Sequence, residues 1–261
     1  MIRTKLAPLL FVAITAATFA AREESFLVTS VHSRTIDGYQ RPRTDTGEFK
    51  PEYYAISNGG AVAGSWQDNA VDKVPFSSLA KPLGELLARQ NYHLAKDKDS
   101  ADLLLVVHWG ATMTADRAPS QQLREMLTAE NARMLGYTEI IERHKELRAV
   151  GSGASSYLEL DQEIVKPRYY LVVSAYDFRS TALEGKRRLL WITRVSIRSA
   201  GNSFAREFSG MLAKAAPYFG QNTERLLRQD EITTRVEIGE LQVIGSTPAT
   251  PAPQRATPDP K

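Results

Sequence analysis

The sequence contains no cysteine. This absence excludes disulfide bonds, cysteine nucleophiles and thiolate metal sites, and it also excludes anchoring through a lipid-modified N-terminal cysteine. The stability of the fold must therefore come from a packed core. Long apolar runs are missing after residue 21. A bilayer span needs about 20 apolar residues, so we expect no transmembrane segment in the mature chain.

Dense clusters of basic residues are also lacking. The formal net charge is +3, and the first 20 residues carry two basic and no acidic residues, which leaves about +1 for the rest. No stripe of Lys and Arg with interleaved aromatic residues is present, so we expect no nucleic-acid partner.

The N-terminus has the pattern of a secretory signal peptide. Arg3 and Lys5 precede an apolar run over 6–21, and Thr18 and Ala20 are small residues at the spacing that a signal peptidase reads. We predict a signal peptide over 1–20 and export to the periplasm or cell envelope of a bacterium. The alternative is an uncleaved membrane anchor, for which the apolar run is short.

The remaining chain divides into three parts. Residues 21–51 are predicted to be an N-terminal arm in which 25–33 can form a strand. Residues 52–245 are predicted to be a single α/β domain with a helical insertion at 112–166. Residues 246–261 alternate Pro with Ala and Thr and predict a disordered Pro-rich tail, because such a segment cannot bury a core.

Helical periodicity occurs in three places. The leucines of 74–90 recur at helical spacing, with Ser77 or Ser78 as the expected cap and Pro82 expected near the first turn. A second helix is predicted over 202–220, with Asn202 or Ser203 as its cap. The insertion predicts one long helix or two, with Gly136 as a possible break.

Strand patterns surround these helices, over 52–57, 103–109, 168–178, 187–197 and 234–245. The unbroken apolar run 103–107 is typical of a central strand. In the strand of 187–197, Leu190, Ile192 and Arg194 are expected to share one face. We predict an α+β fold of the mixed α/β type: a sheet of about five or six strands, two helices on one face, and the helical insertion.

The candidate binding residues lie at the ends of the central strands. His108 and Trp109 end the strand of 103–109, Asp177 ends the next strand, and Arg194 lies on the one after that. A polar site could form there, because ligands bind at strand ends in α/β sheets. The alternative, which we favour, is that Trp109 completes the core and His108 merely ends the strand.

Only one catalytic motif matches. Ser78 and Lys81 form an S-x-x-K pair, as in penicillin-binding proteins, but the companion S-D-N and K-T-G motifs are absent, and a structural serine is the preferred interpretation. The four histidines have no metal-binding spacing. We therefore expect no catalytic residues, no metal and no cofactor.

Part of the chain resembles a group of uncharacterised bacterial envelope proteins, many of them lipoproteins. The similarity rests on the Tyr-containing segment 52–57, on Tyr92, and on the Ala-Asp-Leu start of a strand at 101–103, and it covers about 55–110 and, less well, 168–217. Asn91 replaces the usual Gly, and lipidation does not carry over because cysteine is missing. The resemblance implies a fold similar to the amino-terminal domain of TolB, an envelope location and a role without catalysis.

Together these observations predict an exported cell-envelope protein that binds another macromolecule, with the insertion and the tail as contact elements. The alternatives are a periplasmic hydrolase and a small-ligand-binding protein with a site near His108.

Overall fold

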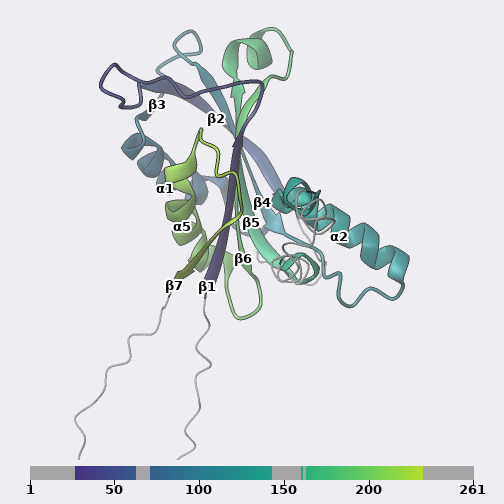
Figure 1. The fold of residues 1–261 in the computed structure, drawn as a ribbon. Coiled ribbons are helices and arrows are strands. Elements are labelled where there is room, and N and C mark those ends of the chain that lie inside the picture. The colour runs from purple at the N-terminus through teal and green to yellow at the C-terminus, as the bar shows by residue number, and fades with distance from the viewer. Residues whose placement is uncertain (1–26, 63–70, 143–159, 161–162, 232–261) are drawn as a thin grey trace, which may run out of the picture.

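The computed structural model describes residues 27–62, 71–142, 160 and 163–231. Seven strands and three long helices alternate along these residues (Figure 1). In chain order the elements are β1 (Leu27–Thr35), β2 (Glu52–Val62), α1 (Phe76–Arg89), β3 (Tyr92–Leu94), β4 (Leu103–Ala111), α2 (Gln121–Leu135), β5 (Arg168–Asp177), β6 (Leu189–Arg198), α5 (Phe204–Ala215) and β7 (Leu227–Glu231). Two single-turn helices follow β5 and α5, at Arg179–Leu183 and Ala216–Tyr218.

The strands form one mixed sheet in the order β3-β2-β4-β5-β6-β1-β7. β2 runs parallel to both β3 and β4, and the other neighbours are antiparallel. The α+β prediction is confirmed, and the sheet has seven strands where about five or six were expected. One of these strands, β1, comes from the segment expected to be an arm, and it lies between β6 and β7.

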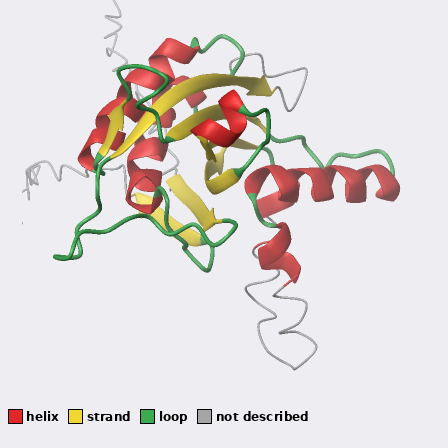
Figure 2. Ribbon diagram, turned by 90° about the horizontal axis from the view of Figure 1, so that it is seen from above, coloured by secondary structure: helices red, strands yellow, loops and turns green. Residues whose placement is uncertain are grey.

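Helices α1 and α5 cover one face of the sheet, as predicted, while α2 lies on the other (Figures 1 and 2). The larger core lies under α1 and α5. Leu79, Leu83 and Leu87 of α1 and Trp191 of β6 are completely buried in it. A smaller core on the opposite face joins the C-terminal end of α2 to β5 and β6.

The start of α1 differs from the sequence prediction. Pro75 is the N-cap residue and no side chain caps the helix, so the expectation of a capping Ser77 or Ser78 is wrong. Pro82 is the seventh residue of the helix rather than a first-turn residue. Its missing N–H leaves the carbonyl of Ser78 without a helical partner, and Ser78 is exposed to water there. Helix α5 likewise begins after Ser203 without a side-chain cap bond.

Helix α2 ends where the sequence indicated. Gly136 follows it in the left-handed conformation, with φ 76°, and its backbone N–H bonds back into the last turn. Ser120 caps the other end by accepting a bond from the Leu123 N–H at 3.2 Å.

A β-bulge explains one incorrect face assignment. The register of β5 and β6 shifts between Ala175 and Tyr176, so that Leu190 has no partner in the ladder. Leu190 consequently packs in the larger core rather than beside Ile192 and Arg194. Alternation alone could not reveal this, because the extra residue leaves no mark in the hydrophobic pattern.

Several predicted features lie outside the described residues. These are the signal peptide over 1–20, the final strand over 234–245, the tail over 246–261, and residues 143–159 and 161–162 of the insertion. Among the described residues, no helix has the length and apolar character that crossing a membrane requires.

Candidate functional site

The register of the central strands decides which predicted site residues meet. His108 pairs with Val172, and Val172 pairs with Arg194, so the three residues form one row across β4, β5 and β6. Directly paired residues point to the same face of a sheet, so His108 and Arg194 share the face that α2 covers. They lie two strand spacings apart, about 10 Å. Asp177 pairs with Leu103 instead, five residues along the ladder from His108, or about 17 Å.

The same row continues onto β1, where His32 pairs with Arg194. The sequence analysis noted His32 only as a histidine without metal-binding spacing. Its place beside Arg194 depends on the pairing of β1 with β6, strands about 160 residues apart, and no local pattern signals that pairing. The row therefore presents two histidines and one arginine to the α2 face.

His108 lies against a glycine of the neighbouring strand. A Cβ at Gly59 would come within 2.6–2.7 Å of three atoms of the His108 ring, so glycine leaves the space that the imidazole occupies beside β2. The register of β2 also shifts here, between Asn58 and Gly60. Burial lowers the pKa of His108 below its ordinary value of 6.5, because the charged imidazolium loses solvation.

Arg194 lies beneath the C-terminal end of α2. A Cβ at Gly136 would come within 2.7 Å of its Cδ and 3.0 Å of His32 Nδ1, so the glycine that ends the helix also makes room for both side chains. Burial, and then the charges of Arg34 and Arg133, lower the pKa of Arg194 to about 10. The guanidinium is therefore still protonated at neutral pH, and the negative end of the α2 dipole lies next to it.

The other two predicted residues lie elsewhere. Trp109 points into the larger core, is 3% exposed, stacks on Phe76 and donates its indole N–H to the Val71 carbonyl at 3.2 Å. Asp177 accepts a bond from the Ser180 N–H at 2.7 Å and pairs with Arg188 at 3.7 Å. Trp109 thus completes the core, and Asp177 holds the turn after β5.

Ser78 and Lys81 do not form a nucleophile and base. Both side chains are exposed on α1, and neither makes a hydrogen bond or ion pair with another described residue. Nucleophile activation needs a base within hydrogen-bond reach of the hydroxyl, and Ser78 has none among the described residues. The described part of the chain also holds no group of three or more His, Asp or Glu residues that could bind a metal.

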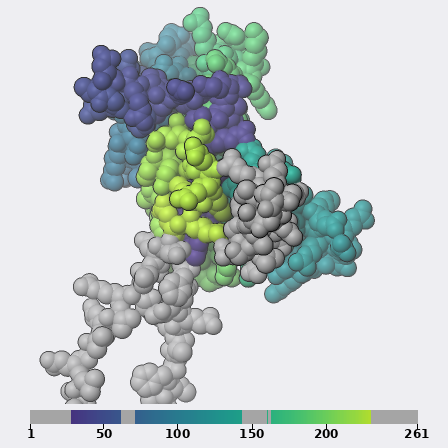
Figure 3. Space-filling view, viewed as in Figure 1, coloured from purple at the N-terminus to yellow at the C-terminus, as the bar shows by residue number. Residues whose placement is uncertain are grey.

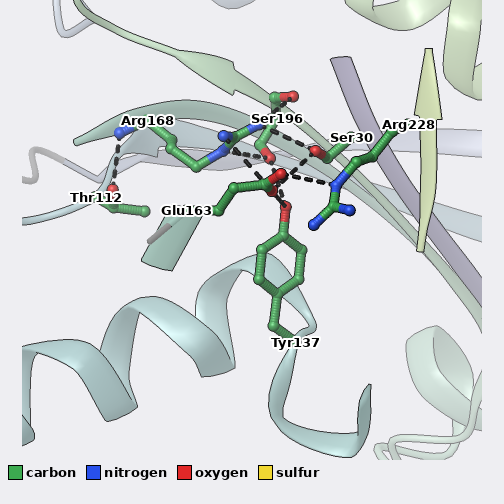
Figure 4. Close-up of polar contacts among 7 residues, drawn as sticks. All are labelled: Ser30, Thr112, Tyr137, Glu163, Arg168, Ser196 and Arg228. Carbon is green, nitrogen blue, oxygen red and sulfur yellow. Dashed lines mark hydrogen bonds and ion pairs between the residues drawn. The ribbon is translucent and has the colours of Figure 1, made fainter. Parts of the chain in front are cut away.

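The most extensive polar cluster was missed by the sequence analysis (Figure 4). Glu163 lies at its centre. One carboxylate oxygen of Glu163 accepts bonds from the Ser30 and Tyr137 hydroxyls at 3.2 and 3.1 Å, and the other accepts from Arg228 Nε at 2.8 Å. Arg168 pairs with the same carboxylate at 3.7 Å and is only 3% exposed.

The remaining donors of Arg168 are also used. Its Nε donates to the Ser196 hydroxyl at 3.0 Å, and its Nη2 donates to the Ser30 hydroxyl and the Ser196 carbonyl, each at 3.1 Å. Its backbone N–H donates to Thr112 Oγ1 at 2.9 Å. Because each charge has several hydrogen-bond partners, the cluster fastens Glu163 and Tyr137, which both come from the insertion, to β1, β5, β6 and β7.

No protein-family model and no curated protein matches this chain. Several solved bacterial structures match this chain, all with low sequence identity. The PelC dodecamer from Paraburkholderia phytofirmans is 10% identical with a TM-score of 0.30, over 72% of this chain and 94% of that chain. A DUF4136 family protein from Bacteroides thetaiotaomicron is 13% identical with a TM-score of 0.34, over 72% and 95%. A PDZ domain protein from Parabacteroides distasonis is 10% identical with a TM-score of 0.39, over 78% of this chain and 39% of that chain.

At these TM-scores the likeness carries no argument about function. The expected similarity to the TolB amino-terminal domain stays a prediction.

Proposed function

We propose that this chain is an exported cell-envelope protein that acts as a non-enzymatic binding or assembly module, with α2 as its main contact element. Export rests on the pattern of residues 1–20. The contact role rests on how α2 is held, which is the observation that carries the proposal.

Within the described part of the chain, helix α2 buries side chains only near its C-terminal end. Of its residues, only Asn131, Ala132 and Leu135 are buried, and the helix projects away from the sheet in both orientations of the ribbon (Figures 1 and 2). The space-filling view in the orientation of Figure 1 shows it at the edge of the molecule (Figure 3). An isolated helix of this length is marginal in water. A helix that gains so little from its own domain is well suited to gain the rest from a partner.

The projecting part also offers a surface to bind. Met126 is 59% exposed, and a groove of about 750 Å³ runs along the helix, with Ala129, Ile141 and Val165 among its lining residues. Apolar residues in a groove beside charged ones, with an exposed Met on the same helix outside the groove lining, are typical of macromolecular contacts. The network around Glu163 supports this use, because it holds the base of the insertion rigidly against the sheet.

Site-specific photocrosslinking in intact cells tests the proposal. A photoreactive amino acid at position 126 is expected to give a discrete crosslinked product from the envelope fraction, whereas the same group at Glu85, exposed on α1, is expected to give none. Equal products at both positions, or none at either, would contradict the contact role of α2. Export is tested separately by fractionation of the cells, which locates the protein, and by the mass of the mature protein, which shows whether residues 1–20 have been removed.

The alternatives predict different results. For a small-ligand protein or a hydrolase with a site near His108, His108→Ala would abolish binding or activity while the crosslink at position 126 stayed unchanged. For the module proposed here, His108→Ala leaves the crosslink at position 126 intact, and no ligand binding or hydrolytic activity is lost. Truncation after residue 245 tests whether the Pro-rich tail contributes to the same contact.

A further inference from the structure

Arg41 is buried in an unusual way for a charged side chain. It lies in the loop between β1 and β2, and its side chain is 1% exposed. Its guanidinium carbon lies 4.0 Å from the centre of the Phe49 ring and 3.9 Å from that of Tyr92. The two rings cover the faces of the guanidinium, so that only its edge can receive further partners.

Part of that edge lacks a hydrogen-bond acceptor. Nη2 donates to the Gln90 carbonyl, and Nε lies 3.4 Å from a Glu52 carboxylate oxygen. Nε and Nη1 nevertheless make no hydrogen bond with any described residue. Buried donors in proteins are almost always satisfied, and an orphaned one points to a bound water, ion or ligand.

A second orphaned donor lies close by. Trp191 Nε1 is buried and likewise makes no hydrogen bond with a residue that the structure describes. The position that a Cβ would take at Gly220 is closest to the Tyr92 hydroxyl oxygen, and it is 3.4 Å from Arg41 Cδ and 3.6 Å from Trp191 Nε1. The side chains of Arg41, Tyr92 and Trp191 thus come together at the backbone of Gly220.

A cavity of about 480 Å³ opens at the same place. Arg41 and Gly220 line it together with Arg43, Gln40 and Asn222, and its lining includes no carboxylate. Arg43 is exposed at the rim and lies over Phe49, with 4.0 Å from its guanidinium carbon to the ring centre. Asn222 Oδ1 accepts a bond from the Thr35 N–H, which leaves the amide nitrogen of Asn222 as the group that it can offer to a ligand. The volume falls in the range of small-molecule sites.

We propose that this cavity binds a small organic carboxylate, with Arg41 Nη1 as the buried donor and Arg43 as the cation at the rim. The site is independent of the contact role proposed for α2, since it lies in the loop between β1 and β2 on the other side of the molecule (Figure 1). A carboxylate fits better than a tetrahedral anion, because the rings of Phe49 and Tyr92 flank the guanidinium and leave Nη1 to donate in the guanidinium plane. Arginine recognises a planar carboxylate in that plane.

Titration of the whole mature chain, labelled with ¹⁵N-tryptophan, tests the proposal. The indole resonance of Trp191, assigned with Trp191→Phe, reports on the donor that faces Gly220. Acetate and succinate are expected to shift this resonance saturably, and chloride at matched ionic strength is expected to leave it unchanged. Phosphate is expected to bind at least fivefold more weakly than succinate.

Three variants make the result specific to the site. Arg41→Lys keeps the charge but loses the planar donor edge, and it is expected to weaken succinate binding at least tenfold. Arg43→Gln changes only the exposed rim of the cavity, and it is expected to weaken succinate binding at least fivefold. Because Arg43 is exposed, this variant keeps the proposed site testable if Arg41→Lys fails to fold. Arg117→Gln, an equal charge change on an exposed residue outside the cavity lining, is expected to have no effect.

The proposal is overturned by any of three results. In the first, no carboxylate shifts the Trp191 resonance saturably, which would leave an ordered water as the partner of Nη1. In the second, Arg43→Gln and Arg117→Gln have equal effects on succinate binding. In the third, phosphate binds as tightly as succinate.

Discussion

At the scale of single residues, the buried ion pair between Glu163 and Arg168 is the most consequential feature. Both charges are largely removed from water, and each depends on the other and on nearby hydroxyls. Removal of one member leaves the opposite charge buried and unpaired, which costs about 3–5 kcal/mol when burial is complete. The pair therefore matters less as a source of net stability than as a condition for docking the insertion.

We predict that Glu163→Gln lowers the free energy of unfolding by about 2–4 kcal/mol, slightly less than for a fully buried pair because Glu163 retains some exposure. Urea unfolding followed by circular dichroism measures this. Glu130→Gln is the matched control, because its ion pair with Arg133 is exposed on α2 and is worth at most about 1 kcal/mol. Similar losses for the two variants would show that the Glu163 network does not hold the fold.

His108 gives the stability a pH dependence. Burial lowers its pKa in the folded state below 6.5, so the unfolded chain takes up the proton first as the pH falls. This contribution to stability is complete above pH 6.5, decreases as the pH falls below 6.5, and stops changing below the folded-state pKa. We predict that the wild-type chain loses more stability than His108→Gln between pH 7.5 and pH 5.

Urea unfolding of both chains at several pH values measures that difference. An NMR titration of the His108 ring gives the folded-state pKa directly. A midpoint at or above 6.5, or parallel losses in both chains, would contradict the prediction.

At the scale of elements, the contact of β2 with β4 depends on Gly59. Gly59 does not have a positive φ, so alanine fits its backbone, and the three atoms nearest to an added Cβ all belong to the His108 ring. We predict that Gly59→Ala costs about 1–3 kcal/mol, as overpacking typically does, and that most of this cost disappears in a His108→Ala background. A double-mutant cycle by urea unfolding measures the coupling. A cost that persists without the imidazole would place the strain in the backbone of the bulge instead.

Elements with strong local periodicity could be predicted from the sequence. The leucine spacing of α1, the glycine after α2 and the apolar run of β4 each carry their own signal, and the structure confirms all three. The capping prediction for α1 is wrong because the sequence around a serine near a helix start does not show whether its side chain accepts a hydrogen bond from the first turn. Leu190 was assigned to the wrong face because the sequence does not show where a bulge falls.

The sites could be predicted only where the order of the chain is also the order in space. His108 and Arg194 could be named as candidates because β4, β5 and β6, which follow one another in the chain, also lie side by side in the sheet. Glu163 bonds to Ser30 across a separation of 133 residues, and Arg41 approaches Gln90 across 49. Such contacts depend on strand order and loop placement, which hydrophobic periodicity does not determine.

At the scale of the whole molecule, the described chain begins and ends on neighbouring strands. β1 and β7 are antiparallel, and Leu27 pairs directly with Glu231. Figure 1 shows both strands leaving the sheet at the same end. Segments that precede β1 and follow β7 therefore attach to the sheet at adjacent points.

This arrangement has a mechanical consequence. A force applied between residues 27 and 231 would open the β1–β7 ladder one residue pair at a time, because the load falls on the terminal Leu27–Glu231 pair and not on all pairs of the ladder at once. Separation of β7 from β1 would then reach the pair of Ser30 and Arg228, where Arg228 forms an ion pair with Glu163 at 2.8 Å. The ion network that docks the insertion thus also acts as a stop against unravelling of the sheet from its edge.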